Sequence, residues 1–245
     1  MENAMNYQTL EKGLGNLIVD KDARYLLNNC KLDIIVKENV NLEIVNFRGC
    51  DEDEALNIRL EKNASVKIYN IVITSTDVVL KENVYLEKPN GNCEITSVLL
   101  ATEDASLNSD INIYHLVGHT TSVFENYGIA RGNAKMTLNN NATIKQGASK
   151  AVVMQKAKGL TLSKNAKIKA MPNLYIDEYD VVANHSAAIG SISNDDLFYL
   201  MSRGLTKEGA TSLVVLGFIK PIIDNINDQN LKDKIYQDFI SKLLK

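Results

Sequence analysis

The chain has 245 residues, 45% of them hydrophobic, which is enough for one large domain with a buried core. Its 27 basic residues nearly balance its 30 acidic ones, and the net charge is -3. This balance excludes a broad positively charged surface for binding nucleic acid or an anionic membrane. No apolar run reaches the length of a transmembrane helix, and the polar N-terminus lacks a signal pattern, so we expect a cytoplasmic protein.

The 3 cysteines, Cys30, Cys50 and Cys93, follow no CxxC-type spacing. We expect them to be small buried residues, although the sequence leaves open whether any of them takes part in function. The first 17 residues are expected to form an N-terminal extension before the main domain.

A short motif recurs along the chain: an apolar residue, two polar residues, Asn, Ala or Val, any residue, and an apolar residue. Its copies lie about 20 to 24 residues apart, with one longer interval, which is typical of a solenoid. Asn tolerates left-handed turn geometry, so we expect each Asn to form a turn between two strands. The motif is centred on Asn39, Asn63, Asn83, Asn141 and Asn165.

Segments beside the motif alternate apolar and polar residues, as in Leu56–Leu60, which indicates strands with one face inside and one in water. Each coil would bury its inner side chains by stacking on its neighbours. We therefore expect a parallel β-helix over residues 18–192. A β-sandwich with similar turns is the alternative, but it gives no reason for one repeated turn motif.

From residue 193 to residue 245 the period becomes helical. Ser193 and Thr206 are expected to cap two helices, Gly204 to end the first, and Asp228 to begin a third. Pro221 should kink or end the second helix. The third carries an apolar stripe, and two interpretations stay open: the helices cover the open end of the solenoid, or the stripe is a partner surface. The stripe consists of Leu231, Ile235, Phe239 and Leu243.

Two stretches carry a resemblance to a known family: residues 172–190, with Pro172, Asp180 and His185, and residues 197–205, which read LFYLMSRGL. They resemble the C-terminal signature of the SufB/SufD family of the SUF iron–sulfur cluster assembly system. The resemblance implies a right-handed parallel β-helix followed by a small α-helical C-terminal region. It also implies a scaffold, not an enzyme, that pairs through its β-helix and docks the SufC ATPase through its C-terminal helices.

Within that family the chain is more similar to SufD than to SufB. SufB-type chains carry a Cys in the strand before the Pro motif and a Glu after the His. Ala166 and Ser186 occupy these two positions here, while His185 is kept. No Walker-type phosphate loop is present, so nucleotide hydrolysis would belong to another chain.

The resemblance implies where function lies. His185, flanked by Asn184 and Ser186, would lie at a subunit interface, where its imidazole is a candidate metal ligand. No cofactor is expected to bind stably to this chain alone; an iron–sulfur cluster or iron would form transiently at the interface. The partners would be a SufC-type ABC ATPase and either a SufB-type subunit or a second copy, with no nucleic acid or membrane. The expected ATPase dock is Leu213, Val214, Gly217, Phe218 and Ile222.

Two other functions remain as alternatives. One is a purely structural β-solenoid scaffold. The other is a β-helix polysaccharide lyase, suggested by the acidic residues Asp177, Glu178 and Asp180, although such enzymes are usually secreted. His115 and His119 are spaced as a helical metal pair would be, but their segment looks like strand and turn, so each is expected to be a core or solvated histidine.

Overall fold

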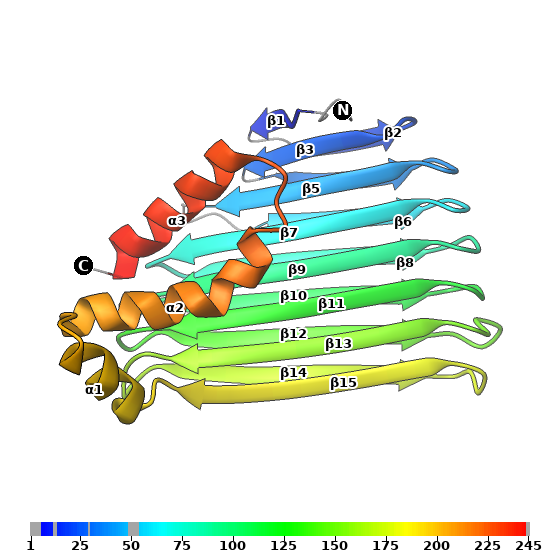
Figure 1. Ribbon diagram of the computed structural model, residues 1–245. Helices are drawn as coiled ribbons and strands as arrows, with labels where there is room; N and C mark the ends of the chain where they lie inside the picture. Colours follow the sequence, from blue (N-terminus) through cyan, green and yellow to red (C-terminus); the bar gives the residue numbers. More distant parts are fainter. Residues whose placement is uncertain (1–5, 12–13, 29, 49–53, 244–245) are drawn as a thin grey trace.

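The structure, a computed structural model, describes residues 6–11, 14–28, 30–48 and 54–243. Its body is a flattened parallel β-solenoid in which successive strands alternate between two sheets (Figure 1). One sheet, here sheet A, has eight strands in the order β1-β3-β5-β7-β9-β11-β13-β15. The facing sheet B has seven, in the order β14-β12-β10-β8-β6-β4-β2. The mainly β, solenoid prediction is therefore confirmed.

The first strands begin at Gln8, before residue 18 where we expected the solenoid to start. The strands of sheet A are β1 (Gln8–Glu11), β3 (Ala23–Asn28), β5 (Asn41–Arg48), β7 (Ser65–Thr74), β9 (Asn92–Ala101), β11 (Thr121–Ala130), β13 (Val152–Thr161) and β15 (Val182–Ser191). Those of sheet B are β2 (Leu14–Val19), β4 (Lys31–Val36), β6 (Glu54–Leu60), β8 (Val78–Leu86), β10 (Ser106–His115), β12 (Lys135–Ile144) and β14 (Lys167–Ile176).

The coils lengthen along the chain. Near the start Leu14 pairs with Lys31, whereas near the end Lys135 pairs with Lys167, almost twice as far along the sequence. The repeat therefore has no fixed period, which is why the motif copies are unevenly spaced. Alternate residues of each strand point into the space between the sheets, where Ile34, Ile58 and other aliphatic side chains form a continuous core.

The repeated Asn has two different roles. Asn39 and Asn63 lie in turns with φ of 61° and 56°, the left-handed geometry that the motif predicts. Asn165 also lies in a turn. Asn83 and Asn141 instead lie inside strands β8 and β12, so the turn prediction is wrong for them. Their side-chain amides bond to asparagines on neighbouring strands, which is the reason for Asn at those positions.

Three helices follow the solenoid: α1 (Asn194–Ser202), α2 (Lys207–Ile223) and α3 (Gln229–Leu243). Their predicted caps are confirmed. Ser193 Oγ accepts from the amides of Asp195 and Asp196, and Thr206 Oγ1 accepts from the amide of Gly209 at 3.1 Å. Gly204, with φ of 95°, follows the end of α1, since a residue with a Cβ is strained in this geometry.

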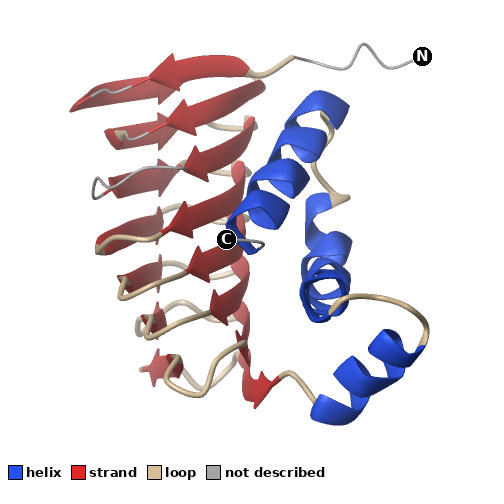
Figure 2. Ribbon diagram, turned by 90° about the vertical axis from the view of Figure 1, so that its left-hand side faces the viewer, coloured by secondary structure: helices blue, strands red, loops and turns tan. Residues whose placement is uncertain are grey.

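The helices do not cover the open end of the solenoid. After α1, the helices α2 and α3 fold back along the outer face of sheet A, as Figure 2 shows. The apolar stripe of α3 is buried there, with Ile235 and Phe239 both 0% exposed. Both interpretations of the stripe, as an end cap and as a partner surface, are therefore wrong. The sequence does carry a signal that the outer face of sheet A is covered. Ile71-Val-Ile and Val98-Leu-Leu are continuous apolar runs, as strands covered on both faces require.

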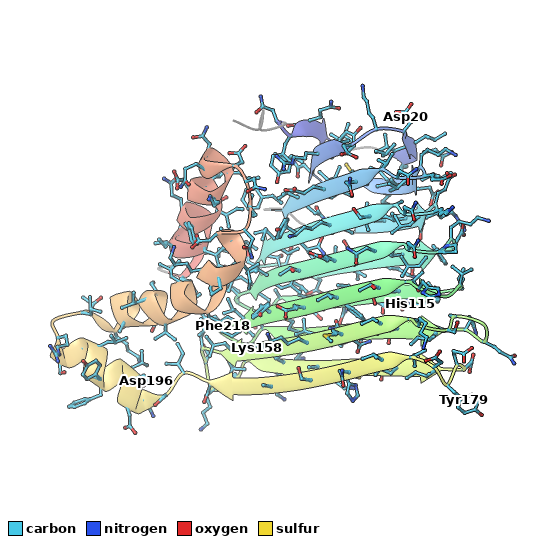
Figure 3. The ribbon with its side chains drawn as sticks, turned by 45° about the vertical axis from the view of Figure 1, so that its right-hand side comes forward. Asp20, His115, Lys158, Tyr179, Asp196 and Phe218 are labelled. Atoms are coloured by element: carbon cyan, nitrogen blue, oxygen red, sulfur yellow. The ribbon has the colours of Figure 1, made fainter. Side chains whose placement is uncertain are left out.

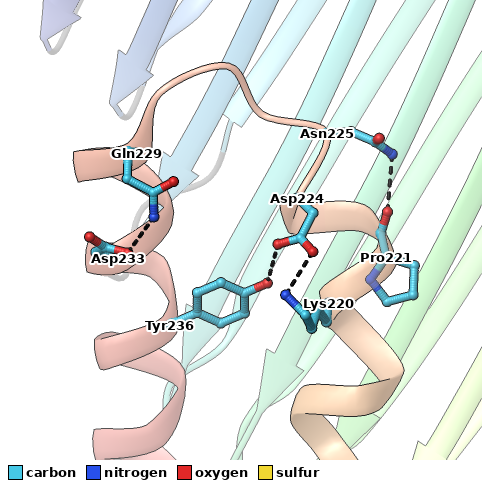
Figure 4. A network of polar contacts seen from close by, with 7 residues as sticks. All are labelled: Lys220, Pro221, Asp224, Asn225, Gln229, Asp233 and Tyr236. Atoms are coloured by element: carbon cyan, nitrogen blue, oxygen red, sulfur yellow. Dashed lines mark hydrogen bonds and ion pairs between the residues drawn. The ribbon is translucent and has the colours of Figure 1, made fainter.

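Pro221 does not end α2, which continues to Ile223. A polar network then fixes the turn toward α3 (Figure 4). Asp224 accepts from Lys220 Nζ at 2.7 Å and from the Tyr236 hydroxyl at 3.0 Å, while Asn225 Nδ2 donates to the Pro221 carbonyl. Burial and the bond to Asp224 raise the pKa of Tyr236 to about 12, so its hydroxyl stays protonated as a donor.

Within the described residues, no helix combines the length and apolar character needed to cross a bilayer.

The far end of α3 is held by a cation of the solenoid. Arg131, at the end of β11, donates to the carbonyl of Leu243 at 2.6 Å and to that of Lys242 at 3.3 Å. These are carbonyls that the last helical turn leaves unsatisfied. Arg131→Ala should therefore destabilise the docking of α3 by about 2 kcal/mol.

Hydrogen exchange measures this effect. In Arg131→Ala the amides of the last turns of α3 should exchange faster, while those of β10 and β12 should not change. Arg59→Ala, which removes a cation from sheet B, the sheet that α3 does not pack against, is the matched control. Unchanged exchange in α3 would contradict a capping role for Arg131.

Candidate functional site

The C-terminal end of the solenoid is open. Its last strands, β14 in sheet B and β15 in sheet A, each pair on one side only. No helix lies over this end, which is the lower end of the solenoid in Figures 1 and 2. The residues predicted for cluster assembly, Asn184, His185 and Ser186, all lie in β15.

These three residues do not share a face. In β13, buried and more exposed residues alternate, with Val153 and Gln155 buried. His185 pairs with Gln155 and therefore points to the same side, toward the interior at the open mouth. Asn184 and Ser186 point to the outer face of sheet A. A site built on His185 is thus reached from the end of the solenoid, not from its side.

His185 has one ring nitrogen fixed and one available. Its Nδ1 lies 3.0 Å from the carbonyl oxygen of Pro172, across the mouth on β14. A carbonyl only accepts, so Nδ1 carries the proton and Nε2 carries the lone pair. An Nδ1–H bond to a backbone carbonyl is the usual way in which proteins orient a metal-binding histidine. His185 is exposed, so its Nε2 lone pair is accessible at the open end.

The edges of β14 and β15 differ. The backbone amides of Lys167 and Asp177 donate to the preceding coil, so the odd-numbered residues of β14 point their amides toward that coil. The even-numbered residues therefore point their amides away from it, toward the open end of the solenoid. Pro172 falls on such a position and has no N–H, while Lys167 and Lys169 place charge on the strand. Both features discourage strand addition. β15 has neither protection: its ten residues, VANHSAAIGS, contain no proline, lysine, arginine or carboxylate. A long bare edge of this kind indicates a pairing surface.

The acidic residues before His185 are occupied by structural contacts. Asp180 pairs with Lys150 at 2.9 Å and Asp177 with Lys145 at 3.7 Å. Glu178 accepts from the amide of Gly147, and this and other backbone hydrogen bonds lower the pKa of its carboxyl. The three carboxylates thus hold the turn between β14 and β15 to the preceding coil. Nothing in this arrangement favours the lyase alternative.

The remaining candidate metal ligands are dispersed. His115 is buried and His119 is exposed in a turn, so they do not form a metal pair, as expected. Cys30 and Cys93 are buried, and burial raises the pKa of the Cys93 thiol; Cys50 lies outside the described residues. Among the residues that the structure describes, no three His, Cys, Asp or Glu side chains gather around a common point.

The predicted ATPase dock divides into two faces of α2. Leu213 is 50% exposed and Gly217 is exposed, whereas Ile222 is buried against sheet A. Phe218 lies between these faces and meets the Tyr127 ring edge-on at 5.5 Å. Lys158 lies over the same Tyr127 ring at 5.7 Å, and Figure 3 labels both residues at the side of the sheet where α2 lies.

The sequence predicted α1 as a helix but did not include it in the ATPase dock. α1 has no buried residue, and its large apolar side chains are exposed, as are Leu205 and Leu213; this set of exposed residues is here called the α1–α2 surface. The sequence carries no signal for this surface, because whether a large hydrophobic residue is exposed depends on the fold. Its members are Phe198, Tyr199, Met201, Leu205 and Leu213.

Comparison with known proteins agrees with this architecture. A family model described as the SufBD core domain of SUF system FeS cluster assembly matches residues 11–218. The iron–sulfur cluster assembly protein SufD of Bacillus subtilis is 32% identical over 153 residues, which is 62% of this chain and 35% of that protein. A SufBD family protein of Pyrococcus horikoshii is 27% identical over 237 residues, 86% of this chain and 51% of its own length.

A further relative, a SufBD family iron–sulfur cluster assembly protein of Mycobacterium tuberculosis, is 26% identical over 200 residues, 80% of this chain and 24% of that protein. The chain thus spans between about a quarter and about half of the length of these relatives. Because the family model covers most of the chain, and relatives named SufD match it as well, this chain belongs to the SufBD family of SUF iron–sulfur cluster assembly proteins.

Proposed function

We propose that this chain is a non-enzymatic scaffold subunit of the SUF system. It pairs through the open end of its solenoid with a SufB-type subunit or a second copy, and it docks a SufC-type ABC ATPase on its C-terminal helices. The observation that supports this best is the bare edge of β15, which presents His185 at its centre with Nε2 available. A chain built for catalysis in its own groove has no need of such an edge.

His185 contributes one ligand to iron or to a nascent cluster at the subunit interface. A single imidazole does not hold a cluster, and clusters are usually bound by thiolates, so the partner supplies the other ligands. The cluster is the cargo of the assembly and not a resident cofactor. Asn184 and Ser186 face outward on the same strand and contact the partner at the rim of the joint.

His185→Ala should lower the iron and sulfide recovered with the assembled complex by about tenfold, since loss of one metal ligand or its support typically costs 10 to 100-fold. The complex should still form, because the edge of β15 remains. Iron and sulfide content and visible absorption measure the loss, and co-elution measures assembly. His119→Gln, which replaces an exposed histidine in a turn outside β15, is the control. A normal cluster yield in His185→Ala would make the histidine structural.

The ATPase docks on the α1–α2 surface together with Val214, Gly217 and Phe218, because this apolar surface is exposed. Ile222 supports the dock from beneath. Leu213→Asp replaces one of the exposed apolar side chains of this surface with a charge and should weaken co-elution with the SufC-type ATPase at least tenfold.

Leu213 is a cleaner test than Phe218, whose contact with Tyr127 means that its replacement also disturbs the packing of α2. Leu14→Asp, an exposed leucine at the opposite end of the solenoid, is the matched control and should bind normally. Full binding by Leu213→Asp would overturn the dock on this surface. A chain that binds no SufC-type ATPase at all would favour the purely structural solenoid.

A further inference from the structure

We propose that the outer face of sheet B binds a purine ring, in a slot that Tyr114 and Tyr175 form over Thr143. The ring belongs to a free nucleoside or nucleotide. The inference goes beyond the proposed function and does not rest on it, because the slot uses neither His185 nor the α1–α2 surface. Three observations carry it: a column of stacked planar groups on sheet B, one short residue that interrupts the column, and the exposure of the tyrosine beyond the interruption.

The column runs across successive strands of this face. Arg59 of β6 is in register with Tyr85 of β8, and Tyr85 with Tyr114 of β10. The Tyr85 and Tyr114 rings stack, with their centroids 4.9 Å apart and their planes 9° from parallel. The Arg59 guanidinium lies over the Tyr85 ring at 4.8 Å, which makes a stack of three planar groups. Planar side chains thus follow one another at the spacing of the strands.

The column is interrupted on β12. There the residue in register with Tyr114 is Thr143, which is itself in register with Tyr175 of β14. A threonine is too short to cover a phenol ring, and in the described part of the chain no ring is recorded against the side of Tyr114 that faces β14. Tyr175 is 56% exposed, so its ring is not packed against the fold. Two strand spacings, about 9.6 Å, separate the two tyrosines.

A slot of this width takes one planar ring. A ring placed midway lies about 4.8 Å from each tyrosine, which is the spacing at which Tyr85 and Tyr114 already stack. Nucleobases stack well on aromatic side chains because every base presents a flat π-face. The two fused rings of a purine cover a phenol ring more completely than a pyrimidine does, so we infer a purine.

The floor of the slot favours a ring with nitrogen atoms over a hydrocarbon ring. Thr143 is half-buried, and within the described residues no hydrogen bond of its hydroxyl is recorded, so the hydroxyl is available to a ring nitrogen or an amino group. Asn141 beside it is occupied, because its Nδ2 donates to β10 and its Oδ1 accepts from β14. Thr143 is therefore the residue that contacts the inner edge of the ring.

The surroundings of the slot suit an uncharged ring with a polar substituent. Lys145, which follows β12, pairs with Asp177, which follows β14, at 3.7 Å, and their charges cancel. No helix of the described chain lies over this face, since α2 and α3 pack on sheet A (Figure 2). The outer edge of a bound purine would face water, where its sugar needs no pocket.

Titration of the full chain with adenosine tests the slot. Backbone amide NMR signals of Tyr114, Thr143 and Tyr175 should shift together, with a dissociation constant on the order of 1 mM for a ring stacked on both faces. Ribose, which lacks the ring, should shift none of them. No shift of these amides at about tenfold this concentration of adenosine would overturn the inference.

Filling the slot from within is the sharper test. Thr143→Tyr supplies the missing ring of the column and should weaken adenosine binding at least tenfold. The matched control is Thr137→Tyr, which adds the same ring to the same face of β12 but outside the column, and it should bind adenosine normally. Thr143→Val keeps the slot open without the hydroxyl and should weaken binding about threefold.

The outer wall is tested by Tyr175→Ala, which should weaken binding about tenfold, whereas Tyr175→Phe keeps a ring and should bind normally. Undiminished binding in Thr143→Tyr would overturn the slot, as would equal losses in Thr143→Tyr and Thr137→Tyr. None of these results bears on the proposed function, because cluster yield and ATPase docking are measured on other residues.

Discussion

Replacing Phe239 with alanine should release α3 from the solenoid. The Phe239 ring is 0% exposed and lies where α3 meets the outer face of sheet A. Removing a buried phenylalanine ring typically costs about 3–5 kcal/mol, through lost apolar burial and the cavity left behind. α3 is attached through one apolar stripe, the Arg131 contacts and the hydrogen bond from Lys242 to Ser75, so a loss of this size should undock most of the helix.

The solenoid should survive this change. Its inward-facing core between the two sheets is separate from the cluster that joins sheet A to the helices. Hydrogen exchange should therefore lose protection in α3 while the amides of β10 and β12 remain slow, and protease should cut between α2 and α3. Gln237→Ala, an exposed neighbour on the same helix, is the control. Equal protection of α3 in Phe239→Ala would mean that other contacts hold the helix.

The attachment of α2 and α3 shows what periodicity can and cannot predict. The spacing of Leu231, Ile235 and Phe239 identifies an amphipathic helix, because the helical period appears within the segment itself. It does not identify the surface that buries the stripe. That surface is formed by strands more than a hundred residues earlier, and only their unbroken apolar runs, such as Val98-Leu-Leu, record it in the sequence.

The repeated Asn illustrates a second limit. A turn such as that of Asn63 and a strand position such as Asn83 have the same neighbours: apolar, polar, polar, Asn, small, any, apolar. The motif is ambiguous because an outward-facing strand residue between inward-facing ones produces the same letters as a turn between two strands. Which role applies depends on where each strand begins and ends: Asn63 falls between β6 and β7, whereas Asn83 falls inside β8.

The sequence predicted which residues make up the candidate site but not how their side chains are oriented. The residues around His185 could be picked out by their resemblance to a family, and the caps at Ser193 and Thr206 by local chemistry. That His185 points into the mouth while Asn184 and Ser186 point outward depends on the register of β15, which the sequence does not give. The α1–α2 surface could not be predicted either, because exposure is a property of packing.

Acidification should destabilise the solenoid through His115. This side chain is 0% exposed and lies at the end of β10, on the right-hand side of the solenoid in Figure 3. Its Nδ1 lies 2.7 Å from the Thr120 hydroxyl and its Nε2 2.8 Å from the Ser122 hydroxyl. Burial lowers its pKa from 6.5 to about 4, since the charged form would lose its hydration.

The sign of the effect follows from linkage. A histidine whose pKa is lower in the folded state binds its proton more readily in the unfolded chain, so protonation favours unfolding. His115 should have no effect above about pH 7.5. It should remove stability progressively as the pH falls from about 6.5 to 4, reaching about 3 kcal/mol at pH 4.

The contribution of His115 can be separated from that of the carboxylates by comparison with His115→Gln, which keeps a polar side chain beside the two hydroxyls but does not titrate. Denaturant unfolding from pH 8 to pH 4 should show a steeper loss of stability in the original chain than in the variant. The difference between the two slopes should be confined to the window between pH 6.5 and 4.

The exposed His119 serves as the control, because His119→Gln should leave the slope unchanged. Parallel curves for the original chain and His115→Gln would mean that water or a rearranged hydroxyl solvates the imidazolium inside the solenoid, and that this interior is more polar than its packing indicates.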